Sequence, residues 1–162
     1  VTTQTRRIYT PRGLAMTEAN STVFREDPKP GQKSGTPVRD AAPTDVPWRR
    51  TITPDPVTLF RYSAITFNPH RIHYDRTYCM ETEGYPGLVV HGPFAQQCIF
   101  DLLRDSAPGR KVKTIAVRAR APLFDTSTFD VIGRPTADGK GAELWTVTPK
   151  GTIATEATAT FA

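Results

Sequence analysis

The stretch HGPFAQQCIFDLLRDSAPG, residues 91–109, constrains the fold of this chain more than any other. Pro93 stands where the first turn of a helix tolerates proline, and the Ala-Pro-Gly sequence at 107–109 is typical of a helix end. Between these signals apolar residues recur at helical spacing, at Phe94, Cys98, Ile99, Leu102 and Leu103. We therefore predict one long helix in this stretch.

Four strand-like runs follow the predicted helix: VKTIAVRARAPLF, TSTFDVIGRP, AELWTVTP and GTIATEATATF. Each run alternates apolar and polar residues or is rich in β-branched residues. The residues between them, Asp-Thr-Ser, Ala-Asp-Gly-Lys-Gly and Pro-Lys-Gly, favour tight turns. We therefore predict an α+β fold, in which an antiparallel sheet accompanies a central helix.

The first and last segments of the chain resemble each other. Residues 1–25 read as two short strands joined by a turn at Pro11, Arg12 and Gly13. Placing Thr10 on Thr148 aligns the two ends without gaps. The further identities are Pro11 with Pro149, Gly13 with Gly151, Thr17 with Thr155, Glu18 with Glu156, Ala19 with Ala157 and Thr22 with Thr160. Chance similarity between two hairpins is the alternative to an internal repeat. We expect the chain, which begins with Val1, to be the end of one repeat and the whole of a second, within a longer protein.

The segment between these hairpins is unusual in composition. Residues 26–56 contain seven prolines, together with Gly31 and Gly35. A segment of this kind cannot bury enough apolar surface to order itself as an independent core. We therefore expect three parts: the hairpin of a first repeat at 1–25, a linker at 26–54 and a complete domain at 55–162.

Charge and composition limit the classes of partner that this chain is expected to bind. Lys and Arg total 21 against 16 Asp and Glu, and the net charge of +5 suits an anionic partner such as a phosphorylated cofactor. The common nucleic-acid module signatures are absent, so we expect a small anionic ligand and no nucleic acid. No apolar run is long enough to span a membrane, and we expect no membrane partner.

Cys79 and Cys98 lack C-x-x-C spacing and are expected to be free thiols. His70 and His73 alone do not supply the clustered ligands of a metal site.

The loop FNPHRIHYD carries two of the three histidines and follows a short helix that Asp55 is suited to cap. His73 lies five residues after Asn68 and two before Asp75, with His70 between them. A neutral imidazole, with an ordinary pKa of about 6.5, is the commonest general base. A single loop histidine is more often structural, but this grouping favours an active site.

The start of the predicted helix, Val90-His91-Gly92-Pro93, is a second site of possible chemistry. Backbone N–H groups at a helix start lack intrahelical partners and stabilise negative charge. Gly92 lets a substrate approach the backbone closely, which suits a developing oxyanion. The alternative is that Gly92 only permits the turn into the helix.

FNPHRIHYD followed by GLVVHGPFAQQ resembles the MaoC-like hotdog-fold (R)-specific enoyl-CoA hydratases and dehydratases. Their signature is an Asp-x-Asn-Pro-x-His loop and a His-Gly at the start of the central helix. SAITFNPHRIHYD is most similar to the two-repeat branch, which contains the 3-hydroxyacyl-thioester dehydratases type 2 and the itaconyl- and mesaconyl-CoA hydratases. The resemblance covers about residues 50–162. It implies a hotdog fold, an antiparallel sheet wrapped around the central helix, preceded by the last hairpin of a mostly absent first hotdog.

The resemblance also implies a reaction, the reversible hydration of an α,β-unsaturated acyl-CoA, without a metal or any cofactor beyond the thioester itself. It places the catalytic histidine on His73 and the partner aspartate on Asn68. This is a departure, because an amide cannot act as a base and can only orient water. His73 then acts alone or with His70 or Asp75 as an auxiliary.

Further site residues are implied in the same way. His91 and Gly92 are expected to polarise the thioester carbonyl at the helix start. Arg61 and Arg71 are candidates for binding a substrate carboxylate if the acyl group is dicarboxylic; the alternative is that both are solvated. The acyl chain, and the choice between coenzyme A and acyl carrier protein, stay open.

Hotdogs of this family pair, so we expect a second hotdog as partner: the chain's own missing N-terminal repeat, a partner chain or another copy. We expect a cytoplasmic protein, or a mitochondrial one if the source is eukaryotic. Two other functions stay open, an acyl-CoA thioesterase, since fold alone does not choose function, and a non-catalytic subunit that binds acyl thioesters.

Overall fold

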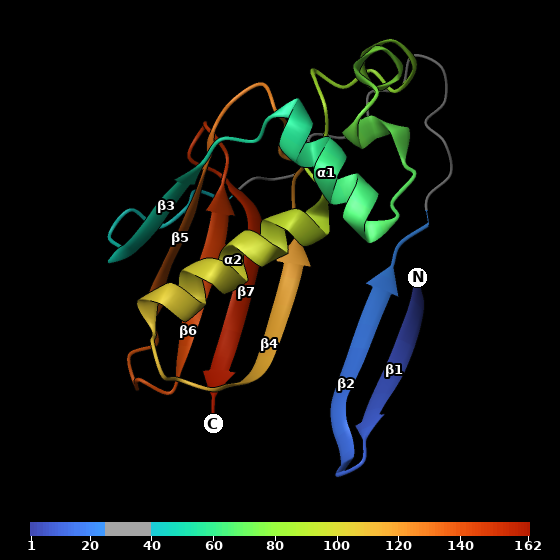
Figure 1. The fold of residues 1–162 in the computed structure, drawn as a ribbon. Helices are drawn as coiled ribbons and strands as arrows, with labels where there is room; N and C mark the ends of the chain where they lie inside the picture. The colour runs from blue at the N-terminus through green and yellow to red at the C-terminus, as the bar shows by residue number, and fades with distance from the viewer. Residues whose placement is uncertain (25–39) are drawn as a thin grey trace. The chain divides into compact units, whose positions relative to one another are not determined.

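The computed structural model describes residues 1–24 and 40–162, which belong to two units, Val1–Thr36 and Pro37–Ala162. The first unit contains an antiparallel hairpin of β1 (Thr2–Thr10) and β2 (Gly13–Thr22) (Figure 1). Gly13 has a φ of +108°, a conformation that glycine adopts without steric cost. The predicted hairpin with its turn at 11–13 is confirmed.

The last two strands of the second unit, β6 (Gly141–Val147) and β7 (Ile153–Phe161), form a comparable hairpin. The pairing register shifts between Ile8 and Tyr9 in the first hairpin and between Thr146 and Val147 in the second. When Thr10 is aligned with Thr148, the two shifts fall at equivalent positions in β1 and β6. The residues that face these positions, on β2 and β7, are offset by one position between the two hairpins. The likeness between the two ends therefore extends to the position of a backbone irregularity.

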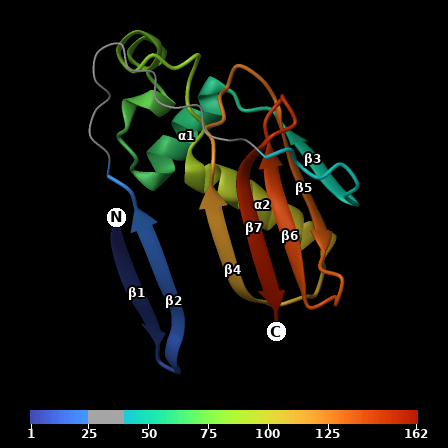
Figure 2. The same cartoon turned by 180° about the vertical axis from the view of Figure 1, so that it is seen from behind.

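The second unit is built on a five-stranded antiparallel sheet in the order β3-β5-β6-β7-β4. The remaining strands are β3 (Trp48–Ile52), β4 (Val112–Ala119) and β5 (Phe129–Pro135). Helix α2 (Gly92–Ser106) lies across one face of this sheet (Figure 1), and the opposite face is toward the viewer in Figure 2. The predicted helix and all four predicted strand runs are confirmed.

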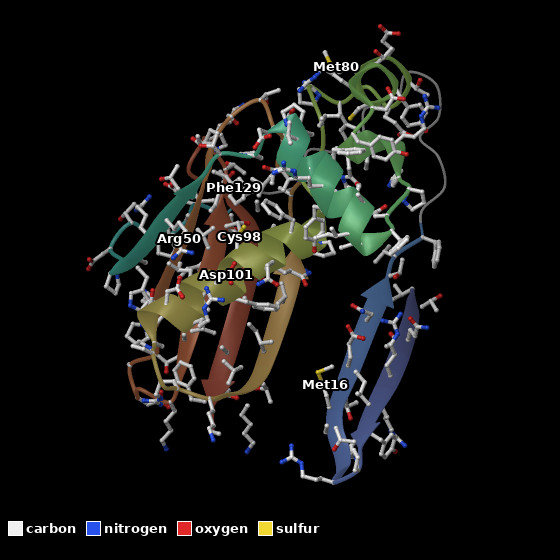
Figure 3. All side chains as sticks on the ribbon, viewed as in Figure 1. Met16, Arg50, Met80, Cys98, Asp101 and Phe129 are labelled. Atoms are coloured by element: carbon white, nitrogen blue, oxygen red, sulfur yellow. The ribbon has the colours of Figure 1, made fainter. Side chains whose placement is uncertain are left out.

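The main core lies between α2 and the sheet. On α2 it consists of Ala95, Cys98, Ile99, Leu102 and Leu103, all of them buried. Cys98 on α2 and Phe129 on β5, both labelled in Figure 3, are buried members of this core. Burial removes apolar surface from water at roughly 25 cal/mol per Å², which makes the contact between helix and sheet the main stabilising element of the unit.

The linker prediction for 26–54 is wrong for its last part, because Trp48–Ile52 is strand β3 at one edge of the sheet. The added strand fits closely: a Cβ built on Gly133, which faces Trp48, would lie 3.0 Å from the Trp48 ring. Arg50 on this strand (Figure 3) donates to Asp105 of α2 at 2.8 Å. Residues 26–39 lie outside the described part of the chain.

The residues just before β3 also belong to the second unit. Ala41 bridges to Thr152, and Ala42 and Val46 pack on a second, smaller apolar cluster. That cluster is formed by Ile132, Trp145, Val147 and Ile153. The described part of the expected linker is therefore part of a folded domain.

Helix α1 (Pro56–Thr66) begins at the predicted N-cap, since Asp55 Oδ1 accepts from the backbone N–H groups of Val57 at 2.9 Å and Thr58 at 3.0 Å. The helix ends at Phe67, whose φ of +52° and ψ of +36° place it in the left-handed region. A 3₁₀ turn, η1 (Arg71–His73), and a π-helical turn, η2 (Tyr78–Thr82), follow. The sequence predicted the broken turn but not the π-helical one. Within the described residues no helix is long and apolar enough to cross a membrane.

Candidate active site

The two predicted catalytic motifs meet through a pair of stacked histidine rings. His73 comes from η1 and His91 from the residue that precedes α2. Their ring centroids are 3.7 Å apart and the ring planes are inclined by 18°. Both side chains are buried, with 7% of His73 and none of His91 exposed. The loop and the helix start, separate in sequence, therefore form one site.

The backbone between the two histidines is held on both sides. Val89 N–H donates to the carbonyl of Ile72 at 3.0 Å, and Val90 N–H donates to the carbonyl of Leu123 at 2.9 Å. Leu88 N–H donates to the carboxylate of Asp125 at 2.9 Å. These bonds fix the carbonyl of Val89 in a defined position beside His73.

The Val89 carbonyl determines the tautomer of His73. His73 Nδ1 lies 2.7 Å from this oxygen, and a carbonyl can only accept, so Nδ1 carries the proton. The neutral ring then presents Nε2 as an unprotonated acceptor. Burial lowers the pKa of His73, and the nearby His70 lowers it further, while the bond to Val89 opposes them. His73 is therefore a neutral imidazole with a free lone pair at neutral pH, which is what a general base requires.

His91 contacts protein on every side. Its Nε2 is 2.8 Å from Ser63 Oγ on α1, and its ring packs 4.8 Å from the ring of Tyr62. Burial, together with His73, lowers the pKa of His91 to about 4, so the ring is uncharged at neutral pH. Because the side chain has no exposed surface, it cannot itself touch a substrate carbonyl. The burial of His91 argues against the expectation that its side chain polarises the carbonyl, and the structure places its ring against that of His73.

The start of α2 is exposed to solvent, whereas the side chain of His91 is buried. Gly92 and Pro93 are exposed, and a Cβ built on Gly92 would meet no atom within 4 Å. The first-turn N–H groups and the helix dipole make this a place for a partial negative charge. The oxyanion role expected of Gly92 stays a prediction, and the structure shows open space at this position.

Asn68 is placed at the loop entrance and not against His73. Its Oδ1 accepts from the backbone N–H of His70 at 3.0 Å, and its own N–H donates to the Ser63 carbonyl at 2.9 Å. Among the described residues no hydrogen bond joins Asn68 to His73. Asn68 does line a groove of about 340 Å³. The other residues of this groove are Phe60, Ser63, Ala64, Phe67, Pro69 and Tyr74.

The two expected auxiliaries differ in their surroundings. The ring of His70 meets that of His73 edge-on, with centroids 5.6 Å apart, so His70 stays close to the site. Asp75 instead accepts from the backbone N–H of Tyr78 at 3.0 Å and from Arg71 Nη2 at 2.7 Å. Both bonds lower the pKa of Asp75, the Tyr78 bond most, and they hold the carboxylate as an anion; among the described residues no hydrogen bond joins it to His73.

The arginines predicted to bind a substrate carboxylate also differ. Arg71 is paired with Asp75 and lies 4.1 Å over the ring of Tyr78, so its charge is already matched. Arg61 is exposed on α1 and does not line the groove. Sequence reasoning gave Ser63 no role, although it begins the stretch SAITFNPHRIHYD and falls four residues after the buried Leu59, on the same face of α1. The described residues contain no group of three His, Cys, Asp or Glu that could hold a metal.

The chain is similar in sequence to a known family and to a characterised relative. The family described as hydroxyacyl-thioester dehydratase type 2 matches residues 1–125, a range that includes the first hairpin. Mesaconyl-C(4)-CoA hydratase of Chloroflexus aurantiacus is 40% identical over 157 residues, which make up 94% of this chain and 52% of that protein. The chain thus spans about half the length of this relative.

Solved structures agree with the fold. The chain is similar to a MaoC-like dehydratase from Phytophthora capsici with a TM-score of 0.73 and 13% identity, over 99% of this chain and 56% of the other. It is also similar to a chain of the ChsH1-ChsH2 complex from Mycobacterium tuberculosis, with a TM-score of 0.61 and 16% identity, over 80% and 98% of the two chains. At these identities the likeness shows the fold, and the expected hotdog architecture is confirmed.

Proposed function

We propose that this chain, which belongs to the hydroxyacyl-thioester dehydratase type 2 family, carries the catalytic hotdog of an enzyme that reversibly hydrates an enoyl-CoA. The observation that carries the proposal is the bond from His73 Nδ1 to the Val89 carbonyl, which leaves Nε2 unprotonated on a ring that stacks on His91, the residue before α2. The family membership and the mesaconyl-C(4)-CoA hydratase of Chloroflexus aurantiacus support the same reaction class.

Hydration proceeds in two steps in this proposal. His73 Nε2 takes a proton from water while the water oxygen bonds to C3 of the enoyl group. The C2=C3 π electrons move toward the thioester, and the negative charge on its oxygen is stabilised by the N–H groups at the start of α2, where Gly92 leaves room. The imidazolium of His73 then gives its proton to C2. The product is the 3-hydroxyacyl thioester, His73 is neutral again, and no redox cofactor is consumed.

Asn68 takes no proton in this scheme. Its carbonyl oxygen has two lone pairs, of which one accepts the His70 N–H, so the second lone pair or the amide N–H₂ remains for a water in the groove. Asn68 therefore orients the water, and its bond to the loop backbone keeps the loop in shape. His70, edge-on to His73, is the nearer of the two expected auxiliaries, since Asp75 is held by Arg71.

The substrate class in this proposal is a coenzyme A thioester of a short unsaturated acid. The net charge of +5 favours the coenzyme A phosphates. If the acyl group carries a second carboxylate, Arg61 is the better of the two predicted arginines, because Arg71 already pairs with Asp75. The relative's substrate, mesaconyl-C(4)-CoA, makes a dicarboxylic acyl group the first to test.

The partner in this proposal is a second hotdog. The sheet ends at β3 on one side and at β4 on the other, and an uncovered edge strand offers unpaired backbone groups to another strand. The similar chain from the ChsH1-ChsH2 complex comes from an assembly of two proteins. This chain spans about half of its relative, and a second hotdog within a longer protein, a partner chain or another copy are the candidate sources.

The experiment follows the ultraviolet absorbance of crotonyl-, mesaconyl- and itaconyl-CoA after mixing with the protein, with free thiol titrated in parallel. Loss of the enoyl band without thiol release, and a 3-hydroxyacyl product by mass spectrometry, is the expected result. Thiol release would instead identify a thioesterase. Binding of the thioesters without any turnover would identify a non-catalytic subunit and overturn the proposal.

A further inference from the structure

Ser63 and His91 form a buried polar pair that the hydration steps do not use. Ser63 lies on α1, is 5% exposed, and its Oγ is 2.8 Å from His91 Nε2. His91 is completely buried and stacks on His73 at 3.7 Å. The pair therefore connects α1 to the ring that backs the proposed base.

His91 depends on Ser63 for its orientation. Among the described residues the other ring nitrogen, Nδ1, is buried without a hydrogen-bond partner. The aromatic rings of Tyr62 and His73 pack against it and do not fix the rotation of an imidazole by hydrogen bonds. The Ser63 hydroxyl can donate or accept, so it suits either tautomer of His91.

We propose that Ser63 is a positioning residue, whose hydroxyl holds the His91 imidazole so that its stacked ring fixes the orientation of His73. This inference deepens the proposed function and rests on it, because it assigns His73 as the base. Ser63 does not touch the reacting atoms in this account and acts only through His91.

The surroundings explain why a neutral anchor is used. The titratable side chains against the two rings are Tyr62 from α1 and His70 from the loop. Burial raises the pKa of Tyr62, so it is uncharged, and among the described residues no carboxylate hydrogen-bonds to either histidine. The side chain of Asn68 bonds to the backbone of His70, and the contacts that orient His73 are the Val89 carbonyl on its edge and the His91 ring on its face.

The first test is a double-mutant cycle on kcat and KM with the best substrate of the panel. We expect Ser63→Ala to lower kcat about 10-fold with little change in KM. The substitution displaces the His73 ring through His91 but leaves the binding of the substrate unchanged. His91→Phe keeps a stacked ring but removes the nitrogen that Ser63 holds. In that background Ser63→Ala should have no further effect, since the pair acts as a unit.

A matched pair of variants separates the hydroxyl from the space that the side chain fills. Ser63→Thr and Ser63→Val have nearly the same volume and differ in the hydroxyl. We expect the threonine variant to keep a kcat several-fold above that of the valine variant. Equal values for the two, or an additive loss in the Ser63→Ala/His91→Phe double variant, would refute the proposal.

A second readout does not depend on turnover. Histidine NMR of the substrate-free chain reports the tautomer and the titration midpoint of His73. In Ser63→Ala we expect a mixed tautomer signal and a midpoint shifted toward the ordinary value, because looser packing admits water to the ring. An unchanged His73 signal would overturn the positioning role even if the wild-type protein hydrates enoyl-CoA. If the wild type fails to hydrate any thioester while this NMR change is seen, the proposed function fails and the packing role stands.

Discussion

Gly92→Ala is the substitution for which stability and activity are expected to move in opposite directions. A Cβ at Gly92 meets no protein atom within 4 Å, and Gly92 is not among the glycines with positive φ. Replacing a glycine whose backbone suits alanine stabilises a protein by about 0.4–1 kcal/mol, because the unfolded chain loses freedom. The folded protein should therefore be at least as stable as the wild type.

The same methyl group occupies the space that the thioester oxygen needs at the start of α2. Removing one donor from an oxyanion site costs about 10²–10³ in kcat, and displacing the oxygen from the helix start should cost a similar factor. Urea titration measures the free energy of unfolding, and the loss of the enoyl band measures kcat. For Gly92→Ala we expect an unchanged or higher free energy of unfolding together with a large loss of kcat.

Gly141→Ala is the matched control. A Cβ on Gly141 would lie 2.2 Å from the backbone oxygen of Ala159, so β6 and β7 must separate. We expect a loss of about 1–3 kcal/mol in the free energy of unfolding, with the kcat of the folded protein largely kept. Full activity of Gly92→Ala would refute the placement of the carbonyl at Gly92, and its unfolding would show that this glycine is structural.

Three further outcomes are expected. The kcat/KM for hydration should fall as the pH drops through the pKa of His73, with a midpoint below 6.5, because burial lowers that pKa; a midpoint above 6.5 in a pH series would contradict the base assignment. The free energy of unfolding should decrease as the pH falls from about 6.5 toward 4, because His91 has a lowered pKa of about 4 in the folded state and the unfolded chain binds its proton first; denaturant titrations should show a flatter curve for His91→Phe. Asp75→Asn should leave kcat almost unchanged, because Asp75 pairs with Arg71 and not with His73; a loss as large as that expected for Gly92→Ala would show that Asp75 takes part in the reaction.

The elements with strong local signals were predictable from the sequence. The helix α2 was indicated by Pro93, by its apolar spacing and by its Ala-Pro-Gly end, and Asp55 marked the start of α1. Both hairpins were predicted because glycine-containing turns separate runs of alternating residues. The strand β3 was missed, because Trp48–Ile52 lies between prolines and carries two arginines whose partners, Asp130 and Asp105, are distant in sequence.

The candidate site was predictable only in part. The meeting of His73 with the start of α2 came from a resemblance, while the fixed tautomer of His73 depends on a backbone carbonyl that no residue type reveals. Ser63 was missed because its contact with His91 joins residues 28 positions apart, across two helices. The pairing of Arg71 with Asp75 was within reach of the sequence, since opposite charges four residues apart meet on a helical turn.

His73 is the proposed base for hydration. Its most direct test is the single-turnover rate of hydration for wild type and His73→Gln, with His70→Gln as the matched control and thioester affinity measured for each. We predict a loss of at least about 10²-fold for His73→Gln with affinity retained, and a much smaller loss for His70→Gln, because His70 only meets the edge of the His73 ring. A His73→Gln protein that hydrates the thioester at the wild-type rate would contradict the account.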